Sequence, residues 1–179
     1  MIRNGVKILL GLSLFVFTFF KALSQSRIIA DRYDKKKNQT ILIILPYGNI
    51  NIPDRWKKTD YNPVSKQYFF RNSDSTTIAI AKNPKEKYPF YKADQSDKIF
   101  IAEFVKWDAE YWEKQGMENK ILTDNSDQGY TTWQVLKNDV NTILLFGLKK
   151  GLVYNFSVTS ATWIDKKKEE FLIQLFNSN

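Results

Sequence analysis

The sequence predicts an α+β fold built on a mainly antiparallel sheet, with one mid-chain helix and one C-terminal helix. Three observations lead to this class. Short apolar or alternating segments recur along the chain with short polar connections between them, as in strands joined by hairpins. Between residues 100 and 112 the apolar positions recur every three or four residues instead, which is typical of an amphipathic helix. The same helical period returns after residue 163 and continues close to the C-terminus.

The chain begins with a pattern that is typical of an export signal. Arg3 and Lys7 precede an apolar run over residues 8–20, and residues 22–24 form a small-x-small tripeptide. A bilayer span needs about 20 apolar residues, and this run is shorter and is interrupted by polar side chains. The pattern predicts a cleaved signal peptide over residues 1–24 and a periplasmic or secreted protein, with an uncleaved N-terminal anchor as the alternative.

The composition excludes several kinds of chemistry. The chain has no cysteine and no histidine, so it cannot form a disulfide, a thiol nucleophile, a Cys/His zinc site or a Ser-His-Asp triad. We therefore expect no catalysis, no metal and no cofactor. A hydrolase built on two carboxylates or on a Ser-Lys pair is the catalytic alternative. The net charge of +8 falls to +5 once the predicted signal peptide, with three basic residues and no acidic one, is removed. This moderate positive charge favours anionic surfaces, but no nucleic-acid module is recognisable, so no nucleic-acid partner is expected.

The exported part starts with a polar, basic stretch over residues 25–40 that contains the triplet Lys35-Lys36-Lys37. We interpret this stretch as a mobile lead-in, with a membrane-surface patch as the sharper alternative. Residues 41–179 are predicted to form a single domain. Its first strand, over residues 41–45, is continuously apolar and suits burial on both faces.

The remaining strands are predicted from alternation and turn residues. A short strand over residues 49–52 ends in the turn 53–56, and residues 67–72 and 76–82 form a hairpin. Short connections then predict an antiparallel meander over four strands, at residues 120–123, 130–137, 142–148 and 152–159.

Two helices complete the predicted domain. The first has Asp94 or Ser96 as its N-cap, Gly116 after its last turn, and an apolar stripe made of Phe100, Ile101, Phe104, Val105, Tyr111 and Trp112. Asp108 falls within this stripe, and a buried carboxylate needs a partner or a raised pKa. The second helix runs from Trp163 to Asn177 with Thr162 and Asp165 as a capping box, and its predicted stripe is Ile164, Phe171, Leu172, Leu175 and Phe176.

Several short motifs together resemble the PsbP/Mog-like superfamily. They are the strand end Ile52-Pro53-Asp54-Arg55-Trp56, the helix around Trp107 to Gly116, the meander with Trp133, and the segment 154–158 followed by the terminal helix. The resemblance covers about residues 48–178. It implies an α-β-α sandwich with a central, mainly antiparallel sheet, and an accessory or chaperone-like role in binding. No shared catalytic residues can be carried over to this chain.

The loop over residues 83–95 is the strongest candidate for a partner-binding site. It places three aromatic residues and two lysines beside two prolines in a polar connection; these five are Lys87, Tyr88, Phe90, Tyr91 and Lys92. Two interpretations remain open. The loop is a lid packed over the sheet, or it is an amphipathic rim that meets an unidentified protein or another envelope component. A lipid-binding surface made of the lysine clusters and these aromatics is the alternative, and it implies peripheral membrane contact.

Two weaker motifs have simpler explanations. Asp124 to Gly129 resembles the start of a calcium-binding loop, but Val135 stands where a bidentate glutamate is required, so a hairpin turn is expected. The triplet Lys166-Lys167-Lys168 opens the last helix with charges that disfavour a helix N-terminus, which suggests either a basic patch or a solvated face.

Overall fold

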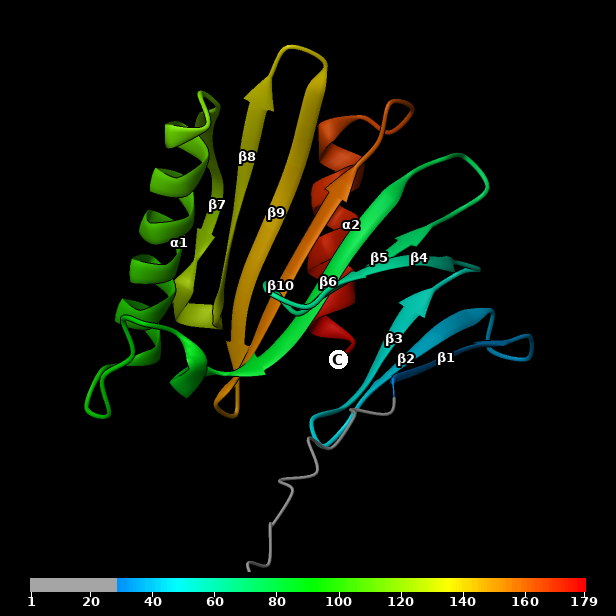
Figure 1. Ribbon diagram of the computed structural model, residues 1–179, viewed down its shortest axis with the longest axis horizontal. Helices are drawn as coiled ribbons and strands as arrows, with labels where there is room; N and C mark the ends of the chain where they lie inside the picture. Colours follow the sequence, from blue (N-terminus) through cyan, green and yellow to red (C-terminus); the bar gives the residue numbers. More distant parts are fainter. Residues whose placement is uncertain (1–28) are drawn as a thin grey trace, which may run out of the picture.

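The computed structural model describes residues 29–179, which form ten β-strands and two α-helices, α1 and α2. The strands lie in two antiparallel sheets, one of three strands and one of seven (Figure 1). The predicted α+β class, with one mid-chain and one C-terminal helix, is confirmed. Neither helix of this described part is long and apolar enough to cross a bilayer. The signal peptide predicted for residues 1–24 lies outside the described residues.

The seven-stranded sheet consists of two meanders that meet along its centre. Its strands are β4 (Lys57–Asn62), β5 (Gln67–Arg71), β6 (Thr77–Pro84), β7 (Glu118–Asn125), β8 (Tyr130–Lys137), β9 (Val140–Lys149) and β10 (Leu152–Thr159). Their spatial order is β4-β5-β6-β10-β9-β8-β7. β6 and β10 pair from Thr77 opposite Thr159 to Pro84 opposite Leu152, which joins the two meanders. The predicted hairpin and the predicted four-stranded meander are both present.

The three-stranded sheet corrects the prediction for residues 25–40. β1 (Ile29–Asp34) pairs with β2 (Gln39–Ile44), which pairs in turn with β3 (Gly48–Pro53). The lysine triplet is the turn between β1 and β2, where the Asp34 carboxylate accepts hydrogen bonds from the backbone N–H groups of Lys36 and Lys37 at 3.0 and 3.3 Å. The prediction of a mobile lead-in was therefore wrong from residue 29 onward. The apolar strand β2 offers a hydrogen-bonding edge, and the polar strand β1 pairs with it.

The second strand that the sequence did not predict, β4, is also polar and lies at the edge of its sheet. Edge strands have one free backbone edge, and charged residues there discourage pairing with another chain. β4 carries Lys57, Lys58 and Asp60, and it pairs with β5 through an irregular register between Lys58 and Asp60. Polar edge strands lack the apolar alternation from which strands are predicted, which explains both omissions.

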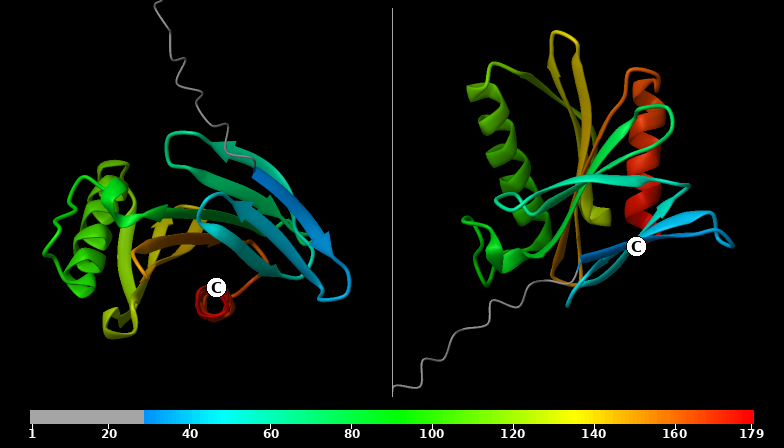
Figure 2. Two further views of the ribbon diagram at one scale, coloured as in Figure 1. Left: turned by 90° about the horizontal axis from the view of Figure 1, so that it is seen from below. Right: turned by 45° about the vertical axis from the view of Figure 1, so that its right-hand side comes forward.

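Helix α1 (Asp97–Lys114) covers one face of the larger sheet, over β7, β8 and β9 (Figure 2). Its caps are those that the sequence predicted. The Ser96 hydroxyl accepts a hydrogen bond from the Ile99 N–H at 3.3 Å, and Gly116 takes the left-handed conformation with φ of +73° just beyond the helix. Phe100, Ile101, Phe104 and Val105 are buried as expected, whereas Tyr111 is exposed and does not belong to the buried stripe.

Helix α2 (Asp165–Asn177) lies on the opposite face of the sheet, over β9 and β10, and the three-stranded sheet lies beside it (Figure 2). The predicted capping box was wrong, because Ile164 is the N-cap and makes no side-chain capping bond. Ile164 is also exposed, so it does not belong to the buried stripe. Asp165 instead accepts hydrogen bonds from Gln134 and Asn141 of the sheet, which anchors the start of the helix to β8 and β9.

The alternation along β9 divides the apolar residues into two cores. Ile143 and Leu145 face α2 and the small sheet, while Leu144 and Phe146 face α1. The first core contains the buried stripe of α2 together with residues of β2 and β3, so the small sheet closes this side of the molecule. The result is the α-β-α sandwich that the resemblance implied, extended on the α2 side by three further strands.

Candidate functional site

The predicted loop over residues 83–95 starts two residues too early, because Asn83 and Pro84 are the last residues of β6. The loop then forms a short 3-10 turn and folds back over the first half of α1 (Figure 1). Tyr88 is its innermost side chain. The centroid of its ring lies 5.8 Å from that of Phe100, 5.5 Å from that of Phe104 and 6.1 Å from that of Phe146. Burial raises the pKa of the Tyr88 phenol, as expected for a hydroxyl under a packed loop. Tyr88 is therefore a packing residue that fixes the loop to α1.

The other four candidate residues lie nearer the outside of the loop. Phe90 packs over α1, with its ring centroid 5.2 Å from that of Phe100 and 5.9 Å from that of Trp107. Lys87 is exposed, and Tyr91 is partly buried with the ammonium of Lys85 5.9 Å from its ring centroid. Lys92 is exposed and reaches the carboxylate of Glu103 at 3.8 Å. The loop is thus packed on its inner side, and Phe90 and Lys92 remain available at its rim.

A shallow groove runs between this rim and α1, and sequence reasoning did not identify its helical side. Its volume is about 400 Å³, and its lining is Phe90, Lys92, Glu103, Lys106, Trp107 and Glu110. Trp107 is 46% exposed, and Tyr111, one turn further along the same helix face, is 52% exposed. We call Phe90, Trp107 and Tyr111 the α1 aromatic surface. The helical period could have revealed it, because Trp107 falls outside the predicted buried stripe.

The charged groups around the α1 aromatic surface are only loosely paired with one another. The ammonium of Lys106 lies 4.0 Å from the carboxylate of Glu110, and the Lys92–Glu103 pair is nearly as long. Exposed pairs of this length contribute about 0–1 kcal/mol each. The two lysines can therefore exchange their partners for charges on another molecule, while Glu103 is also held by a hydrogen bond from the Gln95 side-chain amide at 2.7 Å.

Asp108 lies on the inner side of α1, as its place in the apolar stripe predicted. The indole N–H of Trp112, one turn along, donates a hydrogen bond to its carboxylate at 3.0 Å. Burial raises the pKa of Asp108 to about 6, and the bond from Trp112 offsets part of that rise. This carboxylate is partly buried beside the α1 core, whereas Glu103 and Glu110 lie on the groove side of the helix.

The three lysines at the start of α2 do not form one basic patch. Lys168 is 1% exposed, and its ammonium lies 3.2 Å from the carboxylate of Asp165 and 3.2 Å from the Asn141 carbonyl oxygen. Lys166 and Lys167 are exposed. The charge that disfavours the helix N-terminus is therefore partly neutralised inside the protein, where Lys168 joins α2 to β9.

The loop over residues 124–129 is a hairpin turn, as expected. Asp124 accepts a hydrogen bond from the Ser126 N–H at 3.0 Å, and Asp127 pairs with Lys98 of α1 at 2.9 Å. Across residues 29–179, no group of three or more acidic side chains is arranged to hold a metal ion. These contacts join the turn between β7 and β8 to α1.

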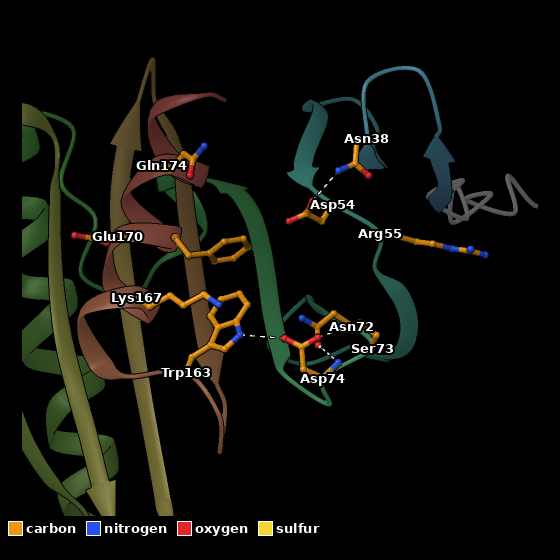
Figure 3. Close-up of a pocket in the computed structure, with 11 residues that line it drawn as sticks. Asn38, Asp54, Arg55, Asn72, Ser73, Asp74, Trp163, Lys167, Glu170 and Gln174 are labelled. Atoms are coloured by element: carbon orange, nitrogen blue, oxygen red, sulfur yellow. Dashed lines mark hydrogen bonds between the residues drawn. The ribbon is translucent and has the colours of Figure 1, made fainter.

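A larger cavity, which sequence reasoning missed, lies against α2 on the other side of the molecule (Figure 3). We call it the α2 cleft; its volume is about 570 Å³, and it is lined by Asn38, Asp54, Arg55, Asn72, Ser73, Asp74, Trp163, Lys167, Glu170, Phe171 and Gln174. These side chains come from the β1–β2 turn, the segment after β3, the β5–β6 turn, the connection before α2, and α2 itself. Each turn could be predicted, but nothing in the sequence shows that the turns meet, because they are far apart along the chain.

Hydrogen bonds hold the polar side chains of the α2 cleft in place. The indole N–H of Trp163 donates to Asp74 at 3.2 Å, and the Asn38 amide donates to Asp54 at 2.8 Å. The bond from Trp163 is the largest of several that lower the pKa of Asp74. Asp74 is therefore a stable carboxylate at neutral pH, suited to accepting hydrogen bonds and unsuited to donating a proton.

One buried cation has no carboxylate partner among residues 29–179. Lys82, on β6, is 6% exposed, and its ammonium has only the Asn49 carbonyl oxygen at 3.5 Å and the Tyr154 ring, whose centroid is 4.9 Å away. Burial lowers the pKa of Lys82, and the positive charge of nearby Lys149 lowers it further. The folded state therefore bears the cost of keeping this charge poorly solvated.

Replacing Lys82 by methionine is expected to raise the free energy of unfolding at pH 7 by about 1 kcal/mol. The folded-state pKa is lower than the unfolded value of 10.5, so the cost is present in full at pH values below the folded-state pKa. It is relieved as the pH rises through the folded pKa, and it is absent above 10.5. Urea unfolding of both proteins between neutral and alkaline pH measures the difference. Lys57→Met, at an exposed edge position, should leave stability unchanged, and a destabilised Lys82→Met protein would contradict the prediction.

No protein-family model matches this chain, and no curated protein matches it. Among solved structures, the solution structure of cyanobacterial PsbP (CyanoP) from Synechocystis sp. PCC 6803 is similar. The structural alignment covers 80% of this chain and 86% of the CyanoP chain, with 18% sequence identity and a TM-score of 0.41. The match is a likeness in fold alone.

Proposed function

We propose that this chain is an exported, non-catalytic accessory protein that binds a protein partner through the α1 aromatic surface. The observation that carries this proposal is the half-exposure of Trp107 and Tyr111 on one helix face, beside Phe90. Tryptophan and tyrosine are enriched among the residues that dominate protein–protein binding energies. Contiguous exposed apolar patches with polar rims mark interaction sites more often than single exposed side chains do.

The surroundings of the α1 aromatic surface define the chemistry of the partner. Lysines and glutamates alternate around the groove, so its rim carries charges of both signs. A partner segment with an apolar centre and charges of both signs at its edges would bury Trp107 and re-pair Lys92 and Lys106. An amphipathic helix or loop of another envelope protein has this pattern.

A lipid surface fits this arrangement less well. Membrane binding through lysines and aromatic residues requires both kinds of side chain on one face. The lysines beside the α1 aromatic surface, Lys92 and Lys106, are balanced there by Glu103 and Glu110. The uncompensated lysine triplet over residues 35–37 lies in a turn at the opposite end of the molecule from α1 and the loop over residues 83–95 (Figures 1 and 2). This separation supports a protein partner over a membrane.

The titratable groups support a binding role over catalysis. A general acid needs a raised pKa and access to a substrate. Asp108 has the raised pKa, but its carboxylate is bonded to Trp112 beside the α1 core. Asp74 lies in a cleft, but its pKa is lowered. Neither residue combines the two requirements.

Replacing Trp107 by alanine is expected to weaken capture of the partner at least tenfold, because loss of a central tryptophan costs about 2 kcal/mol or more at an interface. The tagged wild-type and variant proteins would be crosslinked in their own envelope, and the protein that co-purifies would be quantified. Trp107 is half exposed, so the variant should keep its fold, which circular dichroism checks.

Val64→Ala is the matched control, because Val64 is an apolar side chain in the β4–β5 turn that is 89% exposed. It should capture as much partner as the wild type. Equal capture by Trp107→Ala and wild type would contradict the proposal. So would recovery of anionic lipid in place of a protein.

A further inference from the structure

The α2 cleft lies on the opposite side of the large sheet from the α1 aromatic surface, so it is a separate site (Figure 2). Its volume of about 570 Å³ is within the range of small-molecule sites. Trp163 and Phe171 lie next to each other in one wall and meet edge to face, with ring centroids 5.4 Å apart. Trp56 lies buried against both, at 6.3 and 5.7 Å, and holds them in position. The aromatic wall is therefore rigid and partly open to solvent.

Polar groups from both sides of the cleft add hydrogen-bond acceptors and donors. Asp54 and Asp74 supply carboxylate oxygens on the side that faces α2 (Figure 3). Lys167 and Gln174 of α2 supply an ammonium and an amide. The ammonium of Lys167 lies 4.2 Å from the centroid of the Trp163 ring, so this side chain follows the aromatic wall.

The signs of these charges narrow the class of ligand. Arg55 and Glu170 also line the cleft, but their charged ends point away from its centre (Figure 3). The charges that remain at the centre are two carboxylates and one ammonium. An anion would meet Asp54 and Asp74 at close range, and a cation would meet Lys167, so each would be repelled by part of the wall.

We propose that the α2 cleft binds a short, neutral oligosaccharide. Each sugar hydroxyl both donates and accepts hydrogen bonds, so adjacent hydroxyls can donate to a carboxylate and accept from an amide or ammonium. The apolar C–H face of a pyranose ring can lie against Trp163 or Phe171, which bury a large area with little loss of conformational freedom. The bonds that already position Asp54 and Asp74 reduce the cost of ordering the site on binding.

The test uses the indole N–H signals of the ¹⁵N-labelled protein in nuclear magnetic resonance spectra. The Trp163 signal would be assigned with Trp163→Phe. Maltotriose and triacetylchitotriose are the neutral probes and distinguish a glucan from an N-acetylated glycan; the glucosamine trimer and trigalacturonate are the cationic and anionic probes. At least one neutral probe is expected to shift the Trp163 signal saturably, with a Kd of about 1 mM or lower. The Trp107 signal should not move.

Asp74→Asn should weaken that binding about tenfold or more, since it removes the charge from an acceptor while keeping an oxygen for the Trp163 indole. Glu170 also lines the cleft, but its carboxylate points away from the centre (Figure 3). The Glu170→Gln variant should therefore bind the neutral probe as tightly as the wild type does. The proposal is overturned if neither neutral probe shifts the Trp163 signal at about 10 mM, or if a charged trimer binds more tightly. Neither result affects the capture experiment at Trp107, which tests the proposed function separately.

Discussion

Replacing Gly147 by alanine adds one methyl group and is expected to lower the free energy of unfolding by about 3 kcal/mol. Gly147 is on β9, under the last turn of α2. An ideal Cβ there would lie 2.7 Å from Cζ and 2.8 Å from Cδ2 of Phe176, and closer still to Cε2. Phe176 is fully buried, with Tyr130 and Tyr154 at ring distances of 5.5 and 5.6 Å, so its ring has no space to move into.

Chemical denaturation measures this loss, and Gly151→Ala provides the control. Gly151 has a φ of +74° but open space around its Cβ position, so its alanine variant should lose only the cost of a left-handed backbone, about 1 kcal/mol. In Gly147→Ala the added methyl group meets the Phe176 ring. Combining it with Phe176→Leu should therefore destabilise less than the sum of the two single variants. Strict additivity would show that the added methyl group does not act through the Phe176 ring. A loss of less than about 1 kcal/mol would show that the helix moves aside at little cost.

Replacing Asp108 by asparagine is expected to stabilise the protein by about 3 kcal/mol at pH 7 to 8. Burial raises the pKa of this carboxyl from 3.8 to about 6, so the folded state binds a proton that the unfolded state releases between those values. The neutral acid therefore stabilises the fold below pH 3.8, and this contribution is lost as the pH rises through about 6. Asparagine is neutral throughout and keeps an oxygen for the Trp112 indole.

The stability difference between Asp108→Asn and wild type, measured by urea unfolding from pH 3.5 to 8, should be near zero at the acid end and should grow through pH 4 to 6. Glu113→Gln, an exposed position of the same helix, should change stability by less than about 0.5 kcal/mol at every pH. A difference that is constant with pH would mean that the Asp108 carboxylate is solvated in the folded state.

Much of the fold follows from local patterns. The apolar period of α1, its Ser96 cap and the Gly116 stop were all predicted, because a helix N-cap and a left-handed residue are chosen by neighbouring atoms. The four-stranded meander was predicted because each of its turns joins strands that are adjacent in sequence. The start of α2 was misplaced because Asp165 bonds to Gln134 and Asn141 of the sheet, and such contacts leave no local pattern.

The candidate sites were predicted less completely. The aromatic residues and flanking lysines of the loop over residues 83–95 were predicted as a site, and two of them, Phe90 and Lys92, do line a groove. Composition alone cannot tell an inward ring from an outward one, so Tyr88, a packing residue, was included with them. Trp107 and Tyr111 were not included. The helical period leaves Trp107 outside the predicted buried stripe, but Tyr111 was assigned to that stripe, and only the packed structure shows that it is exposed.

The amino-acid sequence by itself determined the class of this protein, its two helices, most of its strands and the kinds of chemistry that it cannot perform, because these depend on composition and on contacts between neighbours. The tertiary structure alone decided that a polar lead-in joins a sheet, that Lys168 is buried while Tyr111 is exposed, and that Asp54, Asp74 and Trp163 line one cleft. Those outcomes depend on the pairing of distant strands and on which face of α2 meets the sheet. Such contacts between distant segments are selected by packing of the whole core, and they have no periodicity that can be recognised along the chain.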